Sequence, residues 1–331
     1  MRPRIFVTQP VADSAIARLR KVARVTVNPD ASRIISKKAL VAGVRRCDIL
    51  FSLLHDRVDR QAIAANAHLR AIASQSITPD NIDVAEATRR GIVVTVVPPI
   101  VAEATADIAF GLMLMAARHM VEGDRLVHKG RFPGSQSSHL AGTAVYGKTL
   151  GLIGGGGRIG RALARRARGF DMRVLYWSPR RKPESLEREA RMSYAPLDSL
   201  LAQSDFVSIH SPLTPATRHQ VGARELARMK HTAFLINTAR GAIVDEAALA
   251  RALARGQIAG AGLDVFEHEP KVTPALLRMK NVVATPHLGS AVVEVREQMA
   301  NIVVDNILAL LAGKSPPNCV NPEVLAASNR G

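Results

Sequence analysis

The sequence predicts an α/β protein of two domains, each built on a doubly wound parallel sheet. Runs of β-branched residues alternate with helical patterns along the chain, which predicts parallel strands joined by right-handed crossovers. Its 331 residues are long for one hydrophobic core and comfortable for two. Hydrophobic residues make up 47% and charged residues 22%, which is the balance of a folded globular protein.

The first series of elements extends to Pro98 and Pro99. We expect strands at residues 4–8, 49–53, 69–74 and 92–97, and helices at 11–22 and around 60–67. One long amphipathic helix is expected after the prolines, at residues 101–129. Its start carries the acidic Glu103 and Asp107, where the helix dipole favours negative charge.

The second series begins with a strand at residues 149–153. Further strands are expected at residues 173–177, 206–210, 233–238, 261–265 and 282–285, with helices between them. A last helix at residues 292–311 is expected to pack back on the first series. The predicted domains are therefore residues 1–98 with 287–331, and residues 99–286.

Basic residues dominate the charge of the chain. Lysine and arginine total 45 against 28 acidic residues, which gives a formal net charge of +17. Such a surface suits nucleic acids, anionic membranes or small anionic substrates. The basic residues are scattered apart from short clusters, and the sequence has no recognised nucleic-acid-binding module. We therefore favour an arginine-rich solvated surface and expect no nucleic-acid partner.

No segment of the sequence predicts a membrane span or a secretory signal. The longest apolar run, at residues 108–117, is too short to cross a bilayer. The N-terminus has the pattern of a first strand rather than that of a signal peptide. Cys47 and Cys319 offer neither a disulfide framework nor metal-ligand spacing. The expected location is the cytoplasm, with no membrane partner and no bound metal.

A glycine-rich turn follows the first strand of the second series. Gly155, Gly157 and Gly160 fit the pattern G-x-G-x-x-G, and a helix is expected directly afterwards, at residues 159–168. The glycines allow a tight turn and the close approach of a pyrophosphate, which would lie at the helix N-terminus. This context indicates a dinucleotide site, and a merely tight turn is the alternative. An additional glycine, Gly154, precedes the pattern and is expected to bulge the turn.

The end of the strand at residues 173–177 bears on which dinucleotide binds. NAD sites place an acidic residue there to hold the ribose 2′-hydroxyl, and this strand end has none. Ser178, Arg180 and Arg181 follow instead, and guanidinium groups can grip a 2′-phosphate through paired hydrogen bonds. We therefore expect NADP(H) to be preferred over NAD(H). An exposed basic loop is the alternative.

The chain carries six ordered motifs from residue 147 onward. They are residues 147–151 (GKTLG), 158–160 (RIG), 210–214 (HSPLT), 237–241 (NTARG), 262–270 (GLDVFEHEP) and 285–290 (TPHLGS). Together they resemble the D-isomer-specific 2-hydroxyacid dehydrogenase family, most of all its glyoxylate/hydroxypyruvate reductase branch. The likeness continues in residues 51–54 (FSLL), 80–83 (DNID) and 316–321 (PPNCVN). It implies a flavodoxin-like substrate-binding domain, a Rossmann-like dinucleotide-binding domain and a homodimer formed through the long helix.

The resemblance places the catalytic arginine of the family on Arg240, its acid on Glu269 and its proton donor on His287. A guanidinium can hold a substrate carboxylate and polarise the adjacent carbonyl. An imidazole titrates near neutrality, as a general acid should, and Glu269 would orient it and keep it protonated. Taken singly, the three also fit a surface cation, a loop carboxylate and a core histidine. Their order within matching motifs favours catalysis.

The resemblance also implies contacts with the cofactor. They are Arg158 and Ile159 at the pyrophosphate, Ser178, Arg180 and Arg181 at the 2′-phosphate, Ser211 near the ribose, Thr238 and Asp264 beside the nicotinamide, Gly289 and Ser290 beside the histidine, and Thr105 in the long helix. For Asp264, a cap at the end of its strand is the alternative.

Substrate contacts are expected from two loops of the first domain, and from Arg240. One loop carries Leu54, followed by a histidine that either selects a polar substrate or is simply exposed: His55. In the other loop the family normally has a Val-Gly pair whose amides take the substrate carboxylate, and here Ile77 and Thr78 stand before Pro79. Proline has no amide hydrogen and restricts the preceding residue to extended geometry, so an altered pocket is expected.

The sequence therefore predicts NAD(P)H-dependent reduction of a small 2-keto acid, such as glyoxylate, hydroxypyruvate or a sugar-derived 2-keto acid, to the D-2-hydroxy acid. A phosphoglycerate dehydrogenase is the nearest enzyme alternative, although the acid typical of NAD sites is absent and little chain remains for a regulatory domain. A dinucleotide-sensing binding protein of weak activity, similar to the C-terminal-binding-protein corepressors, is the alternative of another class.

Overall fold

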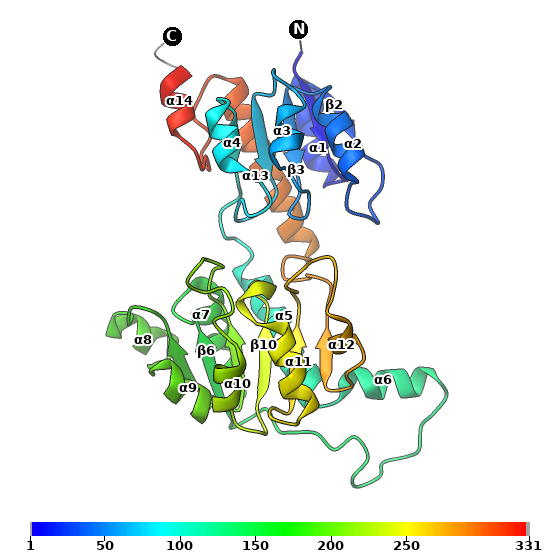
Figure 1. The fold of residues 1–331 in the computed structure, drawn as a ribbon, viewed down its shortest axis with the longest axis vertical. Coiled ribbons are helices and arrows are strands. Elements are labelled where there is room, and N and C mark those ends of the chain that lie inside the picture. The colour runs from blue at the N-terminus through cyan, green and yellow to red at the C-terminus, as the bar shows by residue number, and fades with distance from the viewer. Residues whose placement is uncertain (1, 329–331) are drawn as a thin grey trace. The chain divides into compact units, whose positions relative to one another are not determined.

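The computed structural model describes residues 2–328 and divides them into two compact units (Figure 1). Unit 1 is Met1–Ile100 with Val292–Gly331, and unit 2 is Val101–Ala291. Residues 1 and 329–331, which the predicted first domain includes, lie outside the described residues. Residues 287–291, predicted with the first domain, group with unit 2 instead, because the backbone N–H groups of Leu288 and Gly289 bond to the carboxylate of Asp264.

Within the described residues, unit 1 holds one sheet of five parallel strands in the order β2-β1-β3-β4-β5. The strands are β1 (Arg4–Val7), β2 (Arg24–Val27), β3 (Ile49–Ser52), β4 (Ala71–Ser74) and β5 (Val93–Thr95). The helices are α1 (Asp13–Val22), α2 (Lys37–Val44), α3 (Arg60–Ala64), α4 (Val84–Arg89), α13 (Val293–Leu311) and α14 (Glu323–Ser328). Every residue of β3 and β4 is buried, as in a parallel sheet covered on both faces.

Helix α13 returns to the first unit, as the sequence predicts. It packs on α1 and β4. Polar contacts also join α1 to it; for example, Ser14 Oγ donates to Glu297 at 2.7 Å, and Arg18 pairs with Asp305 at 2.5 Å. The chain therefore completes unit 1 from both of its ends.

Within the described residues, unit 2 holds a sheet of seven parallel strands in the order β12-β11-β10-β9-β6-β7-β8. The strands are β6 (Thr149–Ile153), β7 (Arg173–Trp177), β8 (Ser193–Tyr194), β9 (Phe206–Ile209), β10 (Phe234–Asn237), β11 (Gly260–Leu263) and β12 (Val282–Ala284). The helices are α5 (Ala102–Ala117), α6 (Met120–His128), α7 (Arg158–Arg168), α8 (Glu184–Ala190), α9 (Leu197–Gln203), α10 (Ala223–Arg228), α11 (Glu246–Ala254) and α12 (Pro274–Leu277), with a 3₁₀ turn at Gly241–Ile243.

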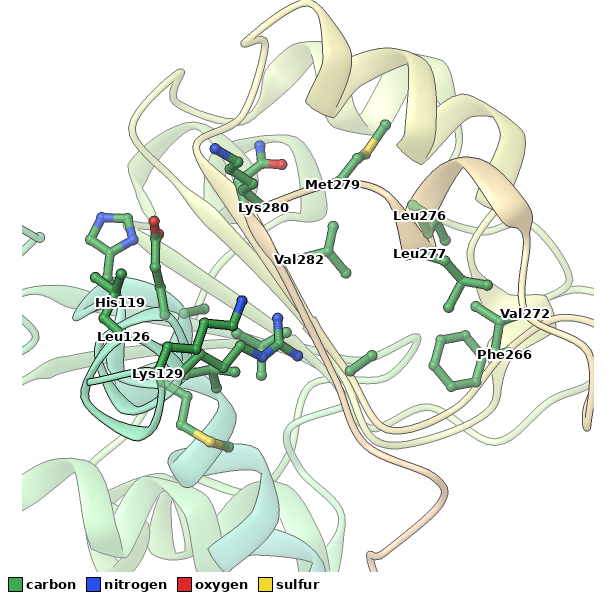
Figure 2. Close-up of a pocket in the computed structure, with 18 of the residues that line it drawn as sticks. His119, Leu126, Lys129, Phe266, Val272, Leu276, Leu277, Met279, Lys280 and Val282 are labelled. Atoms are coloured by element: carbon green, nitrogen blue, oxygen red, sulfur yellow. The ribbon is translucent and has the colours of Figure 1, made fainter. Parts of the chain in front are cut away.

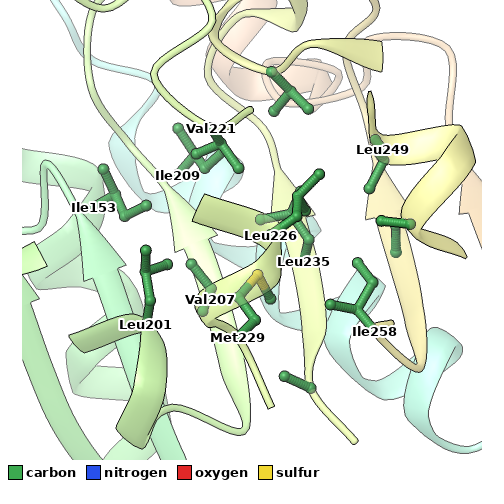
Figure 3. Packing of buried hydrophobic residues seen from close by; sticks show 14 of the residues in the cluster. Ile153, Leu201, Val207, Ile209, Val221, Leu226, Met229, Leu235, Leu249 and Ile258 are labelled. Carbon is green, nitrogen blue, oxygen red and sulfur yellow. The ribbon is translucent and has the colours of Figure 1, made fainter. Parts of the chain in front are cut away.

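Side chains of unit 2 alternate between two cores on opposite faces of this sheet. Leu152 of β6 packs in the core that α5 and α7 cover, whereas the next residue, Ile153, packs in the core beneath α9, α10 and α11 (Figure 3). The same alternation separates Leu235 of β10 from Ile236. Period-two burial on both faces is the pattern of a doubly wound sheet, so the predicted fold class is confirmed.

The single helix predicted at residues 101–129 is wrong, because the chain breaks it into α5 and α6. His119, between them, has a left-handed backbone with φ of 51°. The carbonyl of Ala117, which a continuous helix would pair with the amide four residues on, accepts the N–H of Thr143 at 2.8 Å instead. Helix α6 then runs on with no buried residue. None of the described helices has the length and apolarity needed to cross a bilayer.

Candidate active site

The predicted site residues of unit 2 follow its parallel strands at one edge of the sheet. Since the strands are parallel, their carboxyl ends share that edge, where open α/β sheets bind ligands. In sheet order the residues are His287 after β12, Asp264 and Glu269 after β11, Thr238 and Arg240 after β10, Ser211 after β9, the glycine turn after β6, and Ser178 after β7. The fold thus gathers motifs that are more than 100 residues apart in the chain.

Each glycine of the turn has its own steric role. Gly154 has φ of +77°, and a Cβ there would lie 2.6 Å from the backbone nitrogen of Ser211, so the additional glycine forms the turn itself. A Cβ on Gly160 would lie 2.4 Å from the carbonyl of Gly155, which packs α7 closely on the strand end. Gly157 is the exposed N-cap of α7 and is uncrowded. These roles fit the 155/157/160 register, with the open glycine where a pyrophosphate would approach.

Two buried polar atoms beside this turn lack a hydrogen-bond partner among the described residues. They are Nδ1 of His210, at the end of β9, and Oγ1 of Thr238, at the end of β10. Burial lowers the pKa of His210 to about 4, so its imidazole is neutral, and its Nε2 lies 2.9 Å from Ser208 Oγ. Unpaired buried polar atoms are costly unless a ligand completes them. The edge therefore fits a bound dinucleotide, whose sugar and amide groups would supply the partners.

The loop after β7 is held by a carboxylate that the sequence analysis did not single out. Glu187 accepts two hydrogen bonds from the guanidinium of Arg181, both at 2.8 Å, and one from the Tyr176 hydroxyl at 2.7 Å. The Ser178 hydroxyl donates to the carbonyl of Arg180 at 2.7 Å. Arg181 is thus engaged within the protein, whereas the neighbouring Arg180 is exposed.

Lys182 is a second residue of this loop that the sequence analysis missed. A Cβ on Gly156 would lie 2.5 Å from Lys182 Cε, so the lysine side chain lies directly against the glycine turn. Its position at the end of an RRK run was the available signal, but nothing in the run indicates which of the three cations turns toward the glycines.

His287 and Glu269 form a hydrogen-bonded pair. Nδ1 of the imidazole lies 2.9 Å from one carboxylate oxygen of Glu269, and the other oxygen accepts the N–H of Phe266 at 2.9 Å. Both side chains are more than four-fifths buried, with 17% and 19% exposure. Because an ionised carboxylate only accepts, Nδ1 carries the proton in this pair and Nε2 is the ring nitrogen directed away from it.

The turn that carries His287 is held by Asp264. The carboxylate of Asp264 accepts hydrogen bonds from the backbone of Leu288 and Gly289 and from Thr285 Oγ1, at 2.7, 2.9 and 2.6 Å. His287 itself has φ of 57°, a conformation that a residue with a side chain keeps only where its surroundings enforce it. These contacts of Asp264 are those of a cap at the end of its strand. The contact of Asp264 with the nicotinamide stays a prediction.

Arg240 stands at the start of the 3₁₀ turn after β10. Its backbone carbonyl accepts from Asn237 Nδ2 at 3.0 Å, and its side chain donates to the carbonyl of Ala239 at 2.8 Å. The next residue, Gly241, has no space for a Cβ, which would lie 1.9 Å from the carbonyl carbon of Phe266. This close backbone contact fixes the Arg240 loop against the start of the loop that carries Glu269.

Other predicted contacts also lie at this edge. Thr105 of α5 is 4% exposed and donates its hydroxyl to the carbonyl of Gly289 at 3.1 Å. Ser290 is half-buried beside it, and Ser211 is 6% exposed. Arg158 and Ile159 begin α7, directly after the glycine turn.

The predicted substrate loops of unit 1 follow β3 and β4. Leu54, Ile77 and Thr78 are half-buried, and His55 is exposed. The Thr78 hydroxyl donates to Asp80 at 2.7 Å, and the carbonyl of Thr78 accepts from Ser76 Oγ at 2.7 Å.

A buried carboxylate, which the sequence analysis also missed, holds the loop of Leu54. Asp56 is 1% exposed and accepts from the N–H of Leu53 at 2.7 Å and from the Thr8 hydroxyl. Asn81 donates to the carbonyls of Leu53 and Asp56 at 3.0 and 2.7 Å. Burial raises the pKa of Asp56. No local pattern marks Asp56, because its partners Thr8 and Asn81 come from distant parts of the chain.

A separate cavity of about 390 Å³ lies between α6 and the edge strand β12 (Figure 2). Its lining is largely apolar and includes Leu126, Phe266, Leu276 and Val282, and none of the predicted site residues lines it. It is therefore distinct from the candidate site at the strand ends.

The comparison with known families matches residues 110–289 to the model described as D-isomer specific 2-hydroxyacid dehydrogenase, NAD binding domain. A glyoxylate reductase from Korarchaeum cryptofilum is 46% identical over 328 residues, which cover 98% of each chain.

Solved structures agree with this match. A glyoxylate reductase from Paecilomyes thermophila shares 32% identity at a TM-score of 0.81, covering 97% of this chain and 99% of that one. The NADPH-dependent glyoxylate/hydroxypyruvate reductase of Sinorhizobium meliloti, in complex with NADP and malonate, shares 33% identity at a TM-score of 0.77, with 97% of each chain covered.

Proposed function

Because this chain belongs to the D-isomer-specific 2-hydroxyacid dehydrogenase family and to its glyoxylate reductase branch, we propose that it is an NADP(H)-preferring reductase of glyoxylate, hydroxypyruvate or a sugar-derived 2-keto acid. The observation that carries the proposal is the His287–Glu269 pair at the carboxyl edge of the sheet. Unit 2 would bind the dinucleotide, and unit 1 would bind the substrate.

The nicotinamide supplies a hydride when bound, and the residues of the chain supply the other requirements of the reduction. Arg240 holds the substrate carboxylate with its planar fork and polarises the carbonyl to be reduced. His287 donates the proton from Nε2 to the carbonyl oxygen, since Nδ1 is engaged with Glu269. Glu269 fixes the ring orientation and stabilises the charged imidazole before the proton leaves.

The cofactor preference rests on the loop after β7. No carboxylate stands at the strand end to take a ribose 2′-hydroxyl. Arg181 is occupied by Glu187, so the exposed Arg180 and the glycine-facing Lys182 are the cations that would take a 2′-phosphate. The Ser178 hydroxyl would add a hydrogen bond. Thr238 and His210 would bond the cofactor through their unpartnered atoms.

The active protein would be a homodimer that assembles through α6. Met120 and Val127 are 53% and 59% exposed on this helix, which lies along the apolar cavity of Figure 2. Apolar side chains exposed together favour association, and mass measurement in solution tests the assignment of a homodimer.

We also propose that the protein is located in the cytoplasm, because both cysteines, Cys47 and Cys319, are free thiols.

A panel assay tests the activity. The purified protein should oxidise NADPH with glyoxylate or hydroxypyruvate, and do so with a higher kcat/KM than it shows with NADH. Clear preference for NADH would overturn the cofactor assignment. Binding of the nucleotide without turnover on any 2-keto acid would favour the dinucleotide-sensing alternative, and activity confined to phosphohydroxypyruvate would favour phosphoglycerate dehydrogenase.

The replacement His287→Gln tests the role of the pair. We expect kcat to fall about 100- to 10,000-fold, because the proton donor is removed, while NADPH affinity stays close to that of the wild type. His219→Gln is a matched control, since His219 also pairs with a glutamate, at 2.6 Å from Glu267, and also has a left-handed backbone. An equal loss in both variants would contradict the assignment of His287.

A further inference from the structure

A cavity of about 440 Å³ lies along the flank of α7, bounded by the start of α5 and the end of α8. Four arginines of α7 and two glutamates line it. These are Arg158, Arg161, Arg165 and Arg168, with Glu103 of α5 and Glu189 of α8. None of the catalytic or substrate residues proposed above lines this cavity, and Arg158 is its only link with the glycine turn.

The four arginines form one face of the helix. Their steps of three, four and three residues keep them on the same side, since a helix turns once in about 3.6 residues. From Arg158 to Arg168 the face is about 15 Å long, at about 1.5 Å per residue. The cavity therefore offers a row of cations rather than a single charge.

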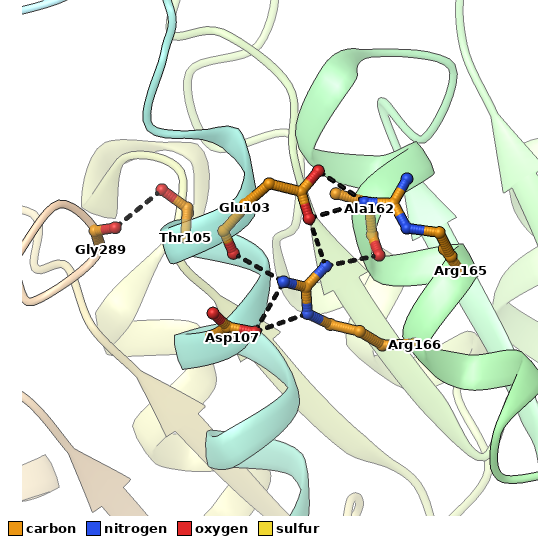
Figure 4. A network of polar contacts seen from close by, with 7 residues as sticks. All are labelled: Glu103, Thr105, Asp107, Ala162, Arg165, Arg166 and Gly289. Carbon is orange, nitrogen blue, oxygen red and sulfur yellow. Dashed lines mark hydrogen bonds and ion pairs between the residues drawn. The ribbon is translucent and has the colours of Figure 1, made fainter. Parts of the chain in front are cut away.

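The acidic residues nearby neutralise only part of this row. The carboxylate of Glu103 contacts Arg165 at 2.6 Å and Arg166 at 2.9 Å, and Arg166 also pairs with Asp107 at 2.6 Å (Figure 4). Hydrogen bonds from Arg165 and Arg166 hold the pKa of Glu103 below its usual range, so it stays charged. This network therefore leaves the other three arginines of the cavity, Arg158, Arg161 and Arg168, outside it.

Arg161 and Arg168 carry the strongest sign of a missing ligand. The Nε–H group of each is buried without a hydrogen-bond partner among the described residues. Arg168 donates from Nη2 to the backbone carbonyl of Glu189 at 2.5 Å, and among the described residues no carboxylate forms an ion pair with Arg161 or Arg168. A buried guanidinium N–H without an acceptor is unfavourable. An anion in the cavity would supply the acceptors and the charge together.

We propose that this cavity is a binding site for a linear polyphosphate, either free or as the tail of a nucleoside polyphosphate. Guanidinium forks bind phosphate oxygens in pairs, and a row of them matches successive phosphates of a chain. The cavity's volume of about 440 Å³ lies in the range of small-molecule sites. The site adjoins that of the dinucleotide at Arg158 and extends from there along α7, whereas the 2′-phosphate of the cofactor would lie at the loop after β7.

Calorimetry on the protein saturated with NADPH tests the proposal. The cofactor fills the pyrophosphate position at the glycine turn, and its fluorescence reports that it stays bound. Inorganic tripolyphosphate should then bind once per chain at about 0.1 M salt, with an affinity that falls as salt rises. Absence of saturable binding, or release of NADPH in step with binding, would overturn the proposal.

Paired variants separate the site from general charge. Arg161→Gln with Arg168→Gln should weaken tripolyphosphate binding at least tenfold. Arg20→Gln with Lys21→Gln, on the exposed end of α1, removes the same charge and should leave the affinity unchanged. Equal weakening by both pairs would show a diffuse effect of charge and overturn the site.

Two further measurements secure the interpretation. Arg161→Lys with Arg168→Lys keeps the charge and the fold but removes the forks, and it should also weaken binding severalfold. Unchanged affinity in this variant would contradict the paired phosphate contacts. ATP without metal distinguishes the two sources of the ligand: affinity equal to that of tripolyphosphate indicates the phosphate chain alone, and tighter binding indicates a nucleoside polyphosphate.

Discussion

The two units of the molecule share a winding pattern but use its central crevice in opposite ways. In unit 1 the first strand, β1, has the second strand on one side and the third on the other, and in unit 2 β6 lies in the same way between β7 and β9. Ligands of open α/β sheets bind where the winding reverses. In unit 2 four glycines, residues 154–157, follow the central strand, whereas in unit 1 residues 8–12 (TQPVA) contain none.

This difference appears in the polar contacts of the two turns. In unit 1 the Thr8 hydroxyl, at the end of β1, is bound to the buried carboxylate of Asp56. In unit 2 the glycines that follow the central strand carry no side chains and form no such contact. Buried polar atoms without a partner among the described residues occur at the strand ends of both units, at Ser52 in unit 1 and at His210 and Thr238 in unit 2. The turn after the central strand is therefore the feature that distinguishes the two units.

Each unit also has a buried aspartate that positions a loop of the proposed active site. Asp264 and Asp56 are both 1% exposed. Asp264 holds a turn that follows a neighbouring strand, with partners 21 to 25 residues further along the chain. Asp56 holds the loop immediately before it, through the N–H of Leu53. We therefore expect loss of Asp264 to displace the reacting histidine and loss of Asp56 to disturb the substrate pocket.

Of the substitutions that test this comparison of the two units, Asp264→Asn should have the largest effect. An amide can accept at only one atom, so one of the two backbone contacts to Leu288 and Gly289 is lost and the His287 turn shifts. A displacement of about 1 Å can cost about 100-fold in rate. Steady-state kinetics should show that loss in kcat, with a smaller change in NADPH affinity.

Asp245→Asn is the matched control, because Asp245 of the same unit only caps α11 through the N–H of Ala248. A kcat for Asp264→Asn equal to that of the control would mean that the turn keeps its shape without the carboxylate. The proposed division of roles between the two buried aspartates would then fail.

Asp56→Asn should have a smaller effect, of a different kind. Its loop carries Leu54 but no reacting group, so KM for glyoxylate should rise about tenfold, as expected for one weakened hydrogen bond to a charged group. The values of kcat and of NADPH affinity should change much less. Asp59→Asn, which alters the N-cap of α3 three residues later, is the control. A loss confined to kcat in Asp56→Asn would contradict the proposed role.

The sequence predicted the strands, the glycine turn and the motif order because these are local patterns. The short apolar runs place β3 and β4, and the glycine-rich turn precedes α7 as expected. The edge strands β2 and β8 were missed. The four residues of β2, RVTV, are at most partly buried, and β8 has only two residues, so neither carries a strong apolar run.

What the sequence could not predict depends on contacts between distant residues. The break at His119 follows from the return of Thr143 to the end of α5. The hydrogen bonds from Arg181 to Glu187 determine which cations remain available beside the glycine turn. The spacing of the charges in the sequence does not reveal these hydrogen bonds. Similarly, the contacts of Asp56 that hold the Leu54 loop include the hydroxyl of Thr8, which lies 48 residues earlier in the chain.

The smallest predicted effect is on thermal stability, and it concerns two buried carboxylates, Glu86 of unit 1 and Glu187 of unit 2. Hydrogen bonds from Arg89 and Arg90 lower the pKa of Glu86 to about 2, and those from Arg181 and Tyr176 lower the pKa of Glu187 to about 2. A carboxyl whose pKa is depressed by folding stabilises the folded state above its unfolded pKa, here near 4.5, and that stabilisation is lost as pH falls toward 2.

Glu86→Gln and Glu187→Gln should therefore lower the Tm at neutral pH and flatten its decline between about pH 4.5 and 2, where the ordinary and depressed pKa values lie. Thermal melts at a series of pH values, followed by near-ultraviolet circular dichroism, measure this. The sole tryptophan, Trp177, lies in unit 2, so its fluorescence should report the change for Glu187→Gln more strongly than for Glu86→Gln. If both variants changed the tryptophan signal equally, the two units would unfold in one transition. The contrast between units 1 and 2 would then apply to their ligand binding and catalysis but not to their stability.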